Sequence, residues 1–343
     1  MHRGHLSGYS GSTMFRFLQS LQHPEWFHGQ GKTPPFFEGW YYKIVDPTER
    51  HRLAVIPAIF LSEESEQQHA FVQVLEGETR SATYHRYPSQ AFEWHETPFR
   101  VSVGSNVFGL DHLSLDIDTA ERSVFGEIAF ENTKPWPVSW FAPGIMGPFA
   151  WLPFLETYHG VLSLDHTLRG TLRVDGQSVS FDGGRGYIEK DWGASFPSAW
   201  VWLQTNHFSQ PGTSLTASIA RIPLGPFRFP GFIVGLWHQG RLHRFTTYNL
   251  SRIEHLHIGS STLEWTLRSP RVRLEIIATR AEGALLRGPS KVDMGVRVPE
   301  TLSAEVWVRL AVLSRGQLTT VFQDTGRHAG LEIVGDVERL LRP

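Results

Sequence analysis

Residues 183–208 read GGRGYIEKDWGASFPSAWVWLQTNHF, and the spacing within them indicates the fold. Trp200, Trp202, Gln204 and Asn206 stand at every second position. A period of two is typical of a β-strand, whose successive side chains point to opposite faces. We therefore expect these four side chains to share one face of an extended strand, with the intervening residues on the other face.

Short segments of the same kind continue in both directions along the chain. They are rich in β-branched and aromatic residues and are separated by Gly, Pro or polar residues, as antiparallel strands are. Asp175-Gly176 lies between two alternating segments and predicts a hairpin. Only residues 14–22 and the extreme C-terminus look weakly helical. The pattern predicts an all-β protein built of antiparallel barrels or sandwiches.

A weak internal repeat indicates two domains. FFEGWYYKIV and FPSAWVWLQTNHF both open with Phe and continue with Trp-x-aromatic, which places Trp40 and Trp200 160 positions apart. We expect a partly flexible N-terminal segment over residues 1–33, one β domain over 34–188 and a second over 189–343.

The segment between the two repeats has a different composition. Residues 133–160 hold five prolines, among them Pro137 and Pro143, and cannot form a central strand. We expect a long aromatic loop that covers or lines a cavity. The 23 Phe, 12 Trp and 32 Gly of the whole chain also favour tightly turned strands around a large apolar interior.

Composition excludes several classes of protein. A net charge of −2 gives no basic footprint for nucleic acid. The lack of cysteine excludes disulfides, thiolate catalysis and zinc–thiolate sites, and agrees with a reducing compartment. The N-terminus lacks the apolar core of a signal peptide, and no run approaches the roughly 18 apolar residues that span a bilayer. We expect a cytoplasmic protein, with peripheral membrane contact as an alternative.

The strand with alternating Trp and amide residues has the composition of a cavity wall. A buried amide left unpaired costs about 1–3 kcal/mol, so Gln204 and Asn206 need partners. A binding cavity combines ring surface for an apolar ligand with a few polar groups that orient it. The first strand repeats this composition, with Glu38, Trp40 and Tyr42 on one face.

A structural interpretation of the same residues stays open. Tryptophans in all-β proteins often only fill a barrel, and the triplet Glu189-Lys190-Asp191 fits a surface turn or a buried ion pair equally well. The His-x-His pair at 255–257 has no carboxylate partner at matched spacing, so no metal site is predicted. GGRG lacks the Lys-Ser/Thr of a phosphate-binding loop, and no cofactor is expected.

Five stretches of the chain resemble the tocopherol cyclase family: FFEGWYYK (36–43), GYIEKDWGASFPSAWVWLQTNHF (186–208), ALLRGPS (284–290), AEVWVRL (304–310) and GLEIVG (330–335). The resemblance covers nearly the whole chain from about Pro34 onward, and within the family the chain looks like the shorter bacterial members. It implies two lipocalin-like antiparallel β-barrel or sandwich domains, with a cavity at or near their interface. It also implies an enzyme that cyclises a prenylated quinol or phenol to a chromanol-type ring.

Such a ring closure implies acid chemistry in an apolar pocket. An alkene is protonated, the phenol oxygen attacks the tertiary cation, and water is excluded. A carboxyl group in such a pocket stays protonated, and aromatic rings stabilise the cation. The candidate acids are Asp191, Glu189 and Glu38, and Lys190 is expected to pair with one of them. The candidate substrate-binding residues are Trp40, Tyr41, Tyr158, His159, Lys190, Trp192, Trp200, Trp202, Gln204 and Asn206.

Two other functions stay open. An isoprenoid hydratase or isomerase would use the same protonation, and the hydratase would admit water. A non-catalytic carrier of lipophilic small molecules would use the charged triplet only for structure. In each case the partner is a lipophilic small molecule, and neither nucleic acid nor metal is expected. The tail length, the head group and the oligomeric state are left open.

Overall fold

The computed structural model describes residues 18–224 and 227–340. Within these ranges the chain forms two antiparallel sheets of 12 and 10 strands. Apart from a helical turn at residues 18–20, the helices described are the short 3-10 turns η1 Ser65–Gln67, η2 Ser89–Ala91, η3 Gly147–Trp151 and η4 Val337–Arg339. The prediction of an all-β antiparallel protein is confirmed. Part of the predicted N-terminal helix and segment, residues 1–17, lies outside the described residues.

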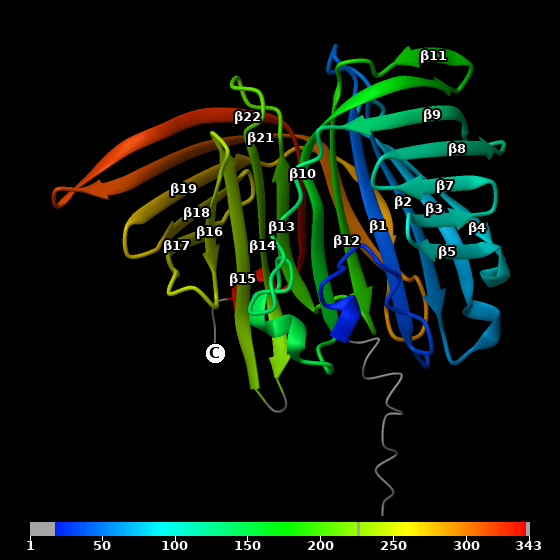
Figure 1. The fold of residues 1–343 in the computed structure, drawn as a ribbon, viewed down its shortest axis with the longest axis horizontal. Coiled ribbons are helices and arrows are strands. Elements are labelled where there is room, and N and C mark those ends of the chain that lie inside the picture. The colour runs from blue at the N-terminus through cyan, green and yellow to red at the C-terminus, as the bar shows by residue number, and fades with distance from the viewer. Residues whose placement is uncertain (1–17, 225–226, 341–343) are drawn as a thin grey trace, which may run out of the picture.

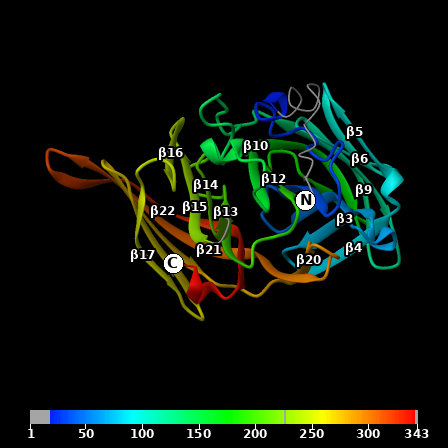
Figure 2. The ribbon, with the colours of Figure 1, turned by 90° about the horizontal axis from the view of Figure 1, so that it is seen from below.

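The first sheet uses most of the N-terminal half of the chain. Its strand order is β4 (Ser81–Tyr87), β3 (His69–Glu76), β2 (Arg52–Leu61), β1 (Phe36–Val45), β12 (Arg185–Gly193), β10 (Thr157–Val174), β9 (Ser123–Glu131), β8 (His112–Asp118), β7 (Asn106–Gly109), β6 (Phe99–Val103) and β5 (Phe92–Glu96). β11 (Gln177–Ser180) pairs with β10 through the predicted Asp175-Gly176 hairpin. Figure 2 shows this sheet curling round on itself.

The second sheet follows the same plan. Its strand order is β16 (Arg241–Thr246), β15 (Phe227–His238), β14 (Ser214–Leu224), β13 (Ala199–Thr205), β22 (Gln317–Gly335), β21 (Val296–Ser314), β19 (Val272–Thr279), β18 (Thr262–Arg268) and β17 (Arg252–Ile258). β20 (Ala284–Gly288) pairs with β21. In Figure 1 the two sheets meet where β10 and β12 lie beside β13 and β14.

The chain changes sheet between Gly193 and Ala199. The expected domain boundary after residue 188 falls inside β12, which pairs with β1 on one side and with β10 on the other. The charge cluster of β12 therefore belongs to the first sheet, and Trp200, Trp202 and Gln204 of β13 belong to the second.

Alternation along the central strands directs neighbouring side chains into separate apolar interiors. On β1, Trp40 and Tyr42 are buried in the core of the first sheet, whereas Tyr41 faces the second sheet and packs edge-on against Trp202 at 5.3 Å. Trp200 also faces this interface. Trp40 thus faces the core of its own sheet, whereas Trp200 faces the interface between the two sheets. The two repeated strands differ in this way because a shift of one residue in register reverses the face to which every side chain points.

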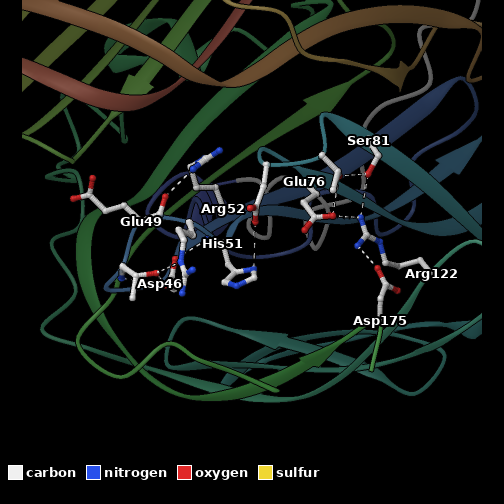
Figure 3. Close-up of polar contacts among 12 residues, drawn as sticks. Asp46, Glu49, His51, Arg52, Glu76, Ser81, Arg122 and Asp175 are labelled. Atoms are coloured by element: carbon white, nitrogen blue, oxygen red, sulfur yellow. Dashed lines mark hydrogen bonds and ion pairs between the residues drawn. The ribbon is translucent and has the colours of Figure 1, made fainter. Parts of the chain in front are cut away.

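Ion pairs fix the ends of the strands (Figure 3). Arg122, in the turn between β8 and β9, is buried and binds Glu76 of β3 (2.8 Å) and Asp175 of the β10–β11 turn (2.7 Å). Glu49, in the β1–β2 turn, binds Arg327 of β22 at 2.7 Å and so links the two sheets. No helix of the described chain is long and apolar enough to cross a membrane.

Candidate active site

A cavity of about 200 Å³ lies between the two sheets. β1, β10 and β12 of the first sheet line one side, and β13, β14, β21 and β22 of the second line the other. The Pro-rich loop between β9 and β10 contributes Met146, Phe149 and Leu155. Apolar side chains form most of the wall, and Arg287 of β20 and Tyr248 also reach it, besides the ionisable groups described below.

The structure brings seven of the predicted site residues to this cavity: Tyr41, Tyr158, His159, Glu189, Asp191, Trp200 and Trp202. Six others do not line it: Glu38, Trp40, Lys190, Trp192, Gln204 and Asn206. The division follows from strand alternation, because Glu189 and Asp191 point from β12 toward the second sheet and Lys190 points the other way.

Glu38, a candidate acid from the sequence, does not line the cavity. Its carboxylate forms a fully buried ion pair with Lys190 and accepts the backbone N–H of His28 at 2.8 Å. Burial opposes ionisation, but Lys190 and His28 outweigh it, and the pKa of Glu38 lies below its ordinary value. Lys190 Nζ also lies 4.5 Å from the ring centroid of Trp40. This group is a buried charge pair on the far side of β1, away from the cavity.

The remaining three residues outside the cavity also have structural partners. Gln204 Oε1 accepts a hydrogen bond from Lys43 Nζ at 3.0 Å. Asn206 donates to Asp165 Oδ1 at 3.0 Å and to a backbone carbonyl at 2.9 Å. Trp192 stacks between His28 and Tyr158, a residue of the cavity wall. Gln204 of β13 and Asn206, which follows β13, therefore connect the two sheets beside the cavity, whereas Trp200 and Trp202 of the strand line it.

Two glutamates that the sequence did not single out complete the polar wall. Glu300 of β21 and Glu332 of β22 stand directly opposite each other in the antiparallel register. Tyr41 donates to Glu300 Oε1 at 2.5 Å, and Trp200 Nε1 donates to Glu332 Oε2 at 2.6 Å. Both carboxyl groups line the cavity.

This pair favours one bound proton near neutral pH. Burial raises the pKa of Glu300 to about 7. Burial and then the charge of Glu300 raise the pKa of Glu332 well above its ordinary value, because two adjacent carboxyl groups cannot both ionise without repulsion. Glu332 is the more accessible of the two, since it is half-buried while Glu300 is 1% exposed.

A third carboxyl group lies on the opposite sheet. Glu189 Oε2 accepts hydrogen bonds from Tyr187 at 2.5 Å and from Trp202 Nε1 at 3.1 Å. Burial raises the pKa of Glu189 to about 7, against the opposing charge of His159. The charge of Glu189 in turn contributes to the raised pKa values of Glu300 and Glu332, so the three carboxyl groups interact.

His159 joins Glu189 to Asp191. Its Nδ1 lies 2.9 Å from Asp191 Oδ1, and its Nε2 lies 3.7 Å from Glu189 Oε2. Burial disfavours the charged ring, but the charges of Asp191 and Glu189 outweigh it and raise the pKa of His159 to about 9. Ligand atoms of these three residues lie within 4.8 Å of one another.

The missed glutamates carried a weak signal in the sequence. Glu332 is the only charge in GLEIVG, whereas Glu300 shares its strand with other charged residues, Arg297, Glu305 and Arg309, and gives a weaker signal. An isolated carboxyl in a strand that is otherwise apolar needs a buried partner. Nothing in the linear sequence, however, indicates that these two positions are opposite each other.

Comparison with known proteins agrees with this architecture. The chain is 23% identical to a chloroplastic tocopherol cyclase of Zea mays, over 90% of this chain and 77% of that protein. It is 26% identical to a probable chloroplastic tocopherol cyclase of Oryza sativa subsp. japonica, over 55% of this chain and 42% of that one.

Two solved structures share the fold. CghA in complex with Sch210972 has a TM-score of 0.56 at 10% identity, covering 88% of this chain and 89% of that one. A putative AttH protein of Nitrosomonas europaea has a TM-score of 0.53 at 13% identity, covering 87% and 92%. These likenesses confirm the expected pair of lipocalin-like β domains. The family model described as tocopherol cyclase-like matches residues 135–335, and the chain belongs to that family.

Proposed function

We propose that this protein is an enzyme that protonates an alkene of a lipophilic substrate and closes a ring on the resulting cation. The proposed substrate class is a prenylated phenol or hydroquinone, and the product is its chromanol-type isomer. One observation carries the proposal: three carboxyl groups with raised pKa values converge on an apolar cavity, each of them hydrogen-bonded to a Trp or Tyr side chain. Membership of the tocopherol cyclase-like family supports it.

The proton donor in this proposal is the Glu300–Glu332 pair. Its shared proton is added to one alkene carbon, and the π electrons of the double bond form the new C–H bond. The other alkene carbon becomes a tertiary cation, and the pair is left with one more negative charge. Glu332 is the member that delivers the proton, because it lines the cavity and is the more exposed residue of the two. A donor with a pKa near the working pH is the most effective acid.

The two tryptophans of β13 have a double role. Their N–H groups donate to Glu332 and Glu189, which fixes the rings beside the acids. Their ring surfaces also line the cavity. A desolvated cation–π contact is worth about 2 kcal/mol, so these rings stabilise the cation next to the place where it forms.

The phenol reacts on the side of the first sheet. A lone pair of its oxygen forms the C–O bond to the cation, and its proton passes to the carboxylate of Glu189. The product has the same atoms as the substrate, and the protein has moved one proton from one carboxyl group to another. His159, charged and held by Asp191, favours the ionised form of Glu189 before the reaction and orients the phenol hydroxyl.

The test uses amide variants of the three carboxyl groups. Glu332→Gln, Glu300→Gln and Glu189→Gln keep the shape of the side chain but cannot supply a strong acid. We expect the Glu332→Gln variant to lose at least about 100-fold in turnover of a prenylated hydroquinone, the usual size of a general-acid contribution. Glu305→Gln is the matched control, because Glu305 lies exposed on the same strand as Glu300.

The mass of the product separates the alternatives. A cyclase gives an isomer of unchanged mass, whereas a hydratase adds the mass of one water molecule. If wild-type protein binds the prenylated hydroquinone but returns it unchanged, the carrier function is favoured. Full turnover in all three amide variants would show that none of these carboxyl groups is the acid.

A further inference from the structure

The loop between β9 and β10, residues 132–156, exposes large aromatic side chains. Phe141 is 90% exposed, Phe154 64% and Trp140 58%. Single exposed apolar residues are common on protein surfaces, but a group of aromatic residues in one loop indicates a contact surface. We call this segment the aromatic loop.

The aromatic loop is also part of the cavity wall. Leu155, which lines the cavity, directly follows the exposed Phe154, and Met146 and Phe149 line it as well. Trp151 Nε1 donates to the carbonyl of Trp140 at 3.0 Å, which holds the exposed part of the loop onto its 3-10 turn η3. A contact made by the exposed aromatic residues would therefore lie next to the space that holds the ligand.

The loop carries no charge along most of its length. Residues 135–155 contain no Asp, Glu, Lys or Arg. Tyr248 binds the carbonyl of Ile145 at 2.8 Å, and Leu250, two residues further along the chain, is 86% exposed. An interface between two proteins normally has a polar rim around its apolar centre. An uncharged surface of Trp, Phe and Leu is typical of side chains that enter the lipid interface.

We propose that the aromatic loop docks on a lipid surface and that the cavity takes its ligand from there. The proposal deepens the proposed function, since it rests on a lipophilic substrate for the cavity. Phe141 and Phe154 would enter the acyl region, and Trp140 would lie at the level of the head groups. The apolar wall formed by Met146 and Leu155 then continues from the lipid into the cavity.

The lack of native cysteine makes a direct test simple. The full-length Phe141→Cys variant is labelled with a dye whose emission depends on polarity and is mixed with vesicles of phosphatidylcholine and phosphatidylglycerol. The matched control is Val321→Cys, because Val321 is 51% exposed on β22, far from the loop. We expect a blue-shifted, brighter emission at position 141 only. No change at 141, or equal changes at both positions, would overturn the proposal.

A second measurement separates lipid docking from other contacts. Trp140→Ser, Phe141→Ser and Phe154→Ser combined should lower co-sedimentation with the same vesicles at least about tenfold, since buried apolar area sets such binding. The same three changes should leave turnover of detergent-solubilised substrate unchanged. Loss of that turnover would contradict a docking role. Self-association of the wild-type chain that the three changes abolish would instead assign the loop to an interface between copies.

The two measurements of vesicle binding, dye emission and co-sedimentation, do not depend on the chemistry of the cavity. An inactive wild-type chain that still binds vesicles through Phe141 would contradict the proposed function and support docking. A chain that cyclises solubilised substrate but does not bind vesicles would support the proposed function and contradict docking.

Discussion

Replacement of Glu38 tests whether the buried charge pair has a structural role. Both Glu38 and Lys190 have fully buried side chains, and Lys190 also donates to the carbonyl of Trp26 at 2.7 Å. Glu38→Gln leaves the lysine without a counter-charge in a place that water does not reach. Removal of one partner of a buried ion pair costs about 3–5 kcal/mol, and we expect a value near the lower end because the amide still accepts hydrogen bonds.

The assay is denaturant unfolding of the wild type, Glu38→Gln, Lys190→Met and the double variant Glu38→Leu/Lys190→Met. The double variant leaves no unpaired charge and should recover most of the free energy of unfolding lost in each single variant. The folded fraction of Glu38→Gln should keep its turnover. Since the pKa of Glu38 lies below its ordinary value, its contribution to stability is present above the unfolded pKa and disappears as the pH falls through the folded pKa.

One result would refute this reasoning. A Glu38→Gln variant that unfolds like the wild type but has lost turnover would make Glu38 the acid after all. It would also show that the ion pair with Lys190 does not fix the protonation state of Glu38.

Three further predictions concern the cavity. Turnover should be greatest near pH 7, because the Glu300–Glu332 pair loses its shared proton above the raised pKa of Glu300, about 7, and Glu189 gains a proton below its own raised pKa, also about 7; a rate that is flat from about pH 6 to about pH 8 would contradict this. Asp191→Asn should lower the pKa of His159 from about 9, since one of the two charges that raise it is removed, and an NMR titration of the imidazole measures the change. Trp200→Phe should reduce turnover less than Glu332→Gln does, because a smaller ring keeps its π face but loses the N–H donor to Glu332; an equal loss in kcat would indicate that the donor matters more than the ring.

The fold could be predicted because it depends on local pattern. A period of two in Trp200, Trp202 and Gln204 predicts a strand, and this prediction does not require knowledge of which strands pair with it. Asp175-Gly176 predicts a tight turn for the same reason. The change of sheet between Gly193 and Ala199 is not local, because it depends on which strands pair with β12.

The site could be predicted only in part. Alternation places Glu189 and Asp191 on one face of β12 and Lys190 on the other, but it does not say which face meets the second sheet. On β1, Tyr41 lines the cavity and Trp40 does not. The chemical nature of the two side chains does not determine which of them faces the cavity. The pairing of distant glutamates across β21 and β22 depends on the register of two long strands interrupted by bulges, and sequence reasoning has no access to it.

The central claim is that a carboxyl group of the cavity protonates the substrate's alkene. The most direct measurement is the reaction of a prenylated hydroquinone with the wild-type protein in D₂O, followed by mass spectrometry and NMR of the product. Carboxyl protons exchange with solvent, so the account predicts one deuterium on the carbon next to the newly formed C–O bond. A cyclised product with no solvent deuterium at that carbon would contradict the protonation step and the role of Glu332.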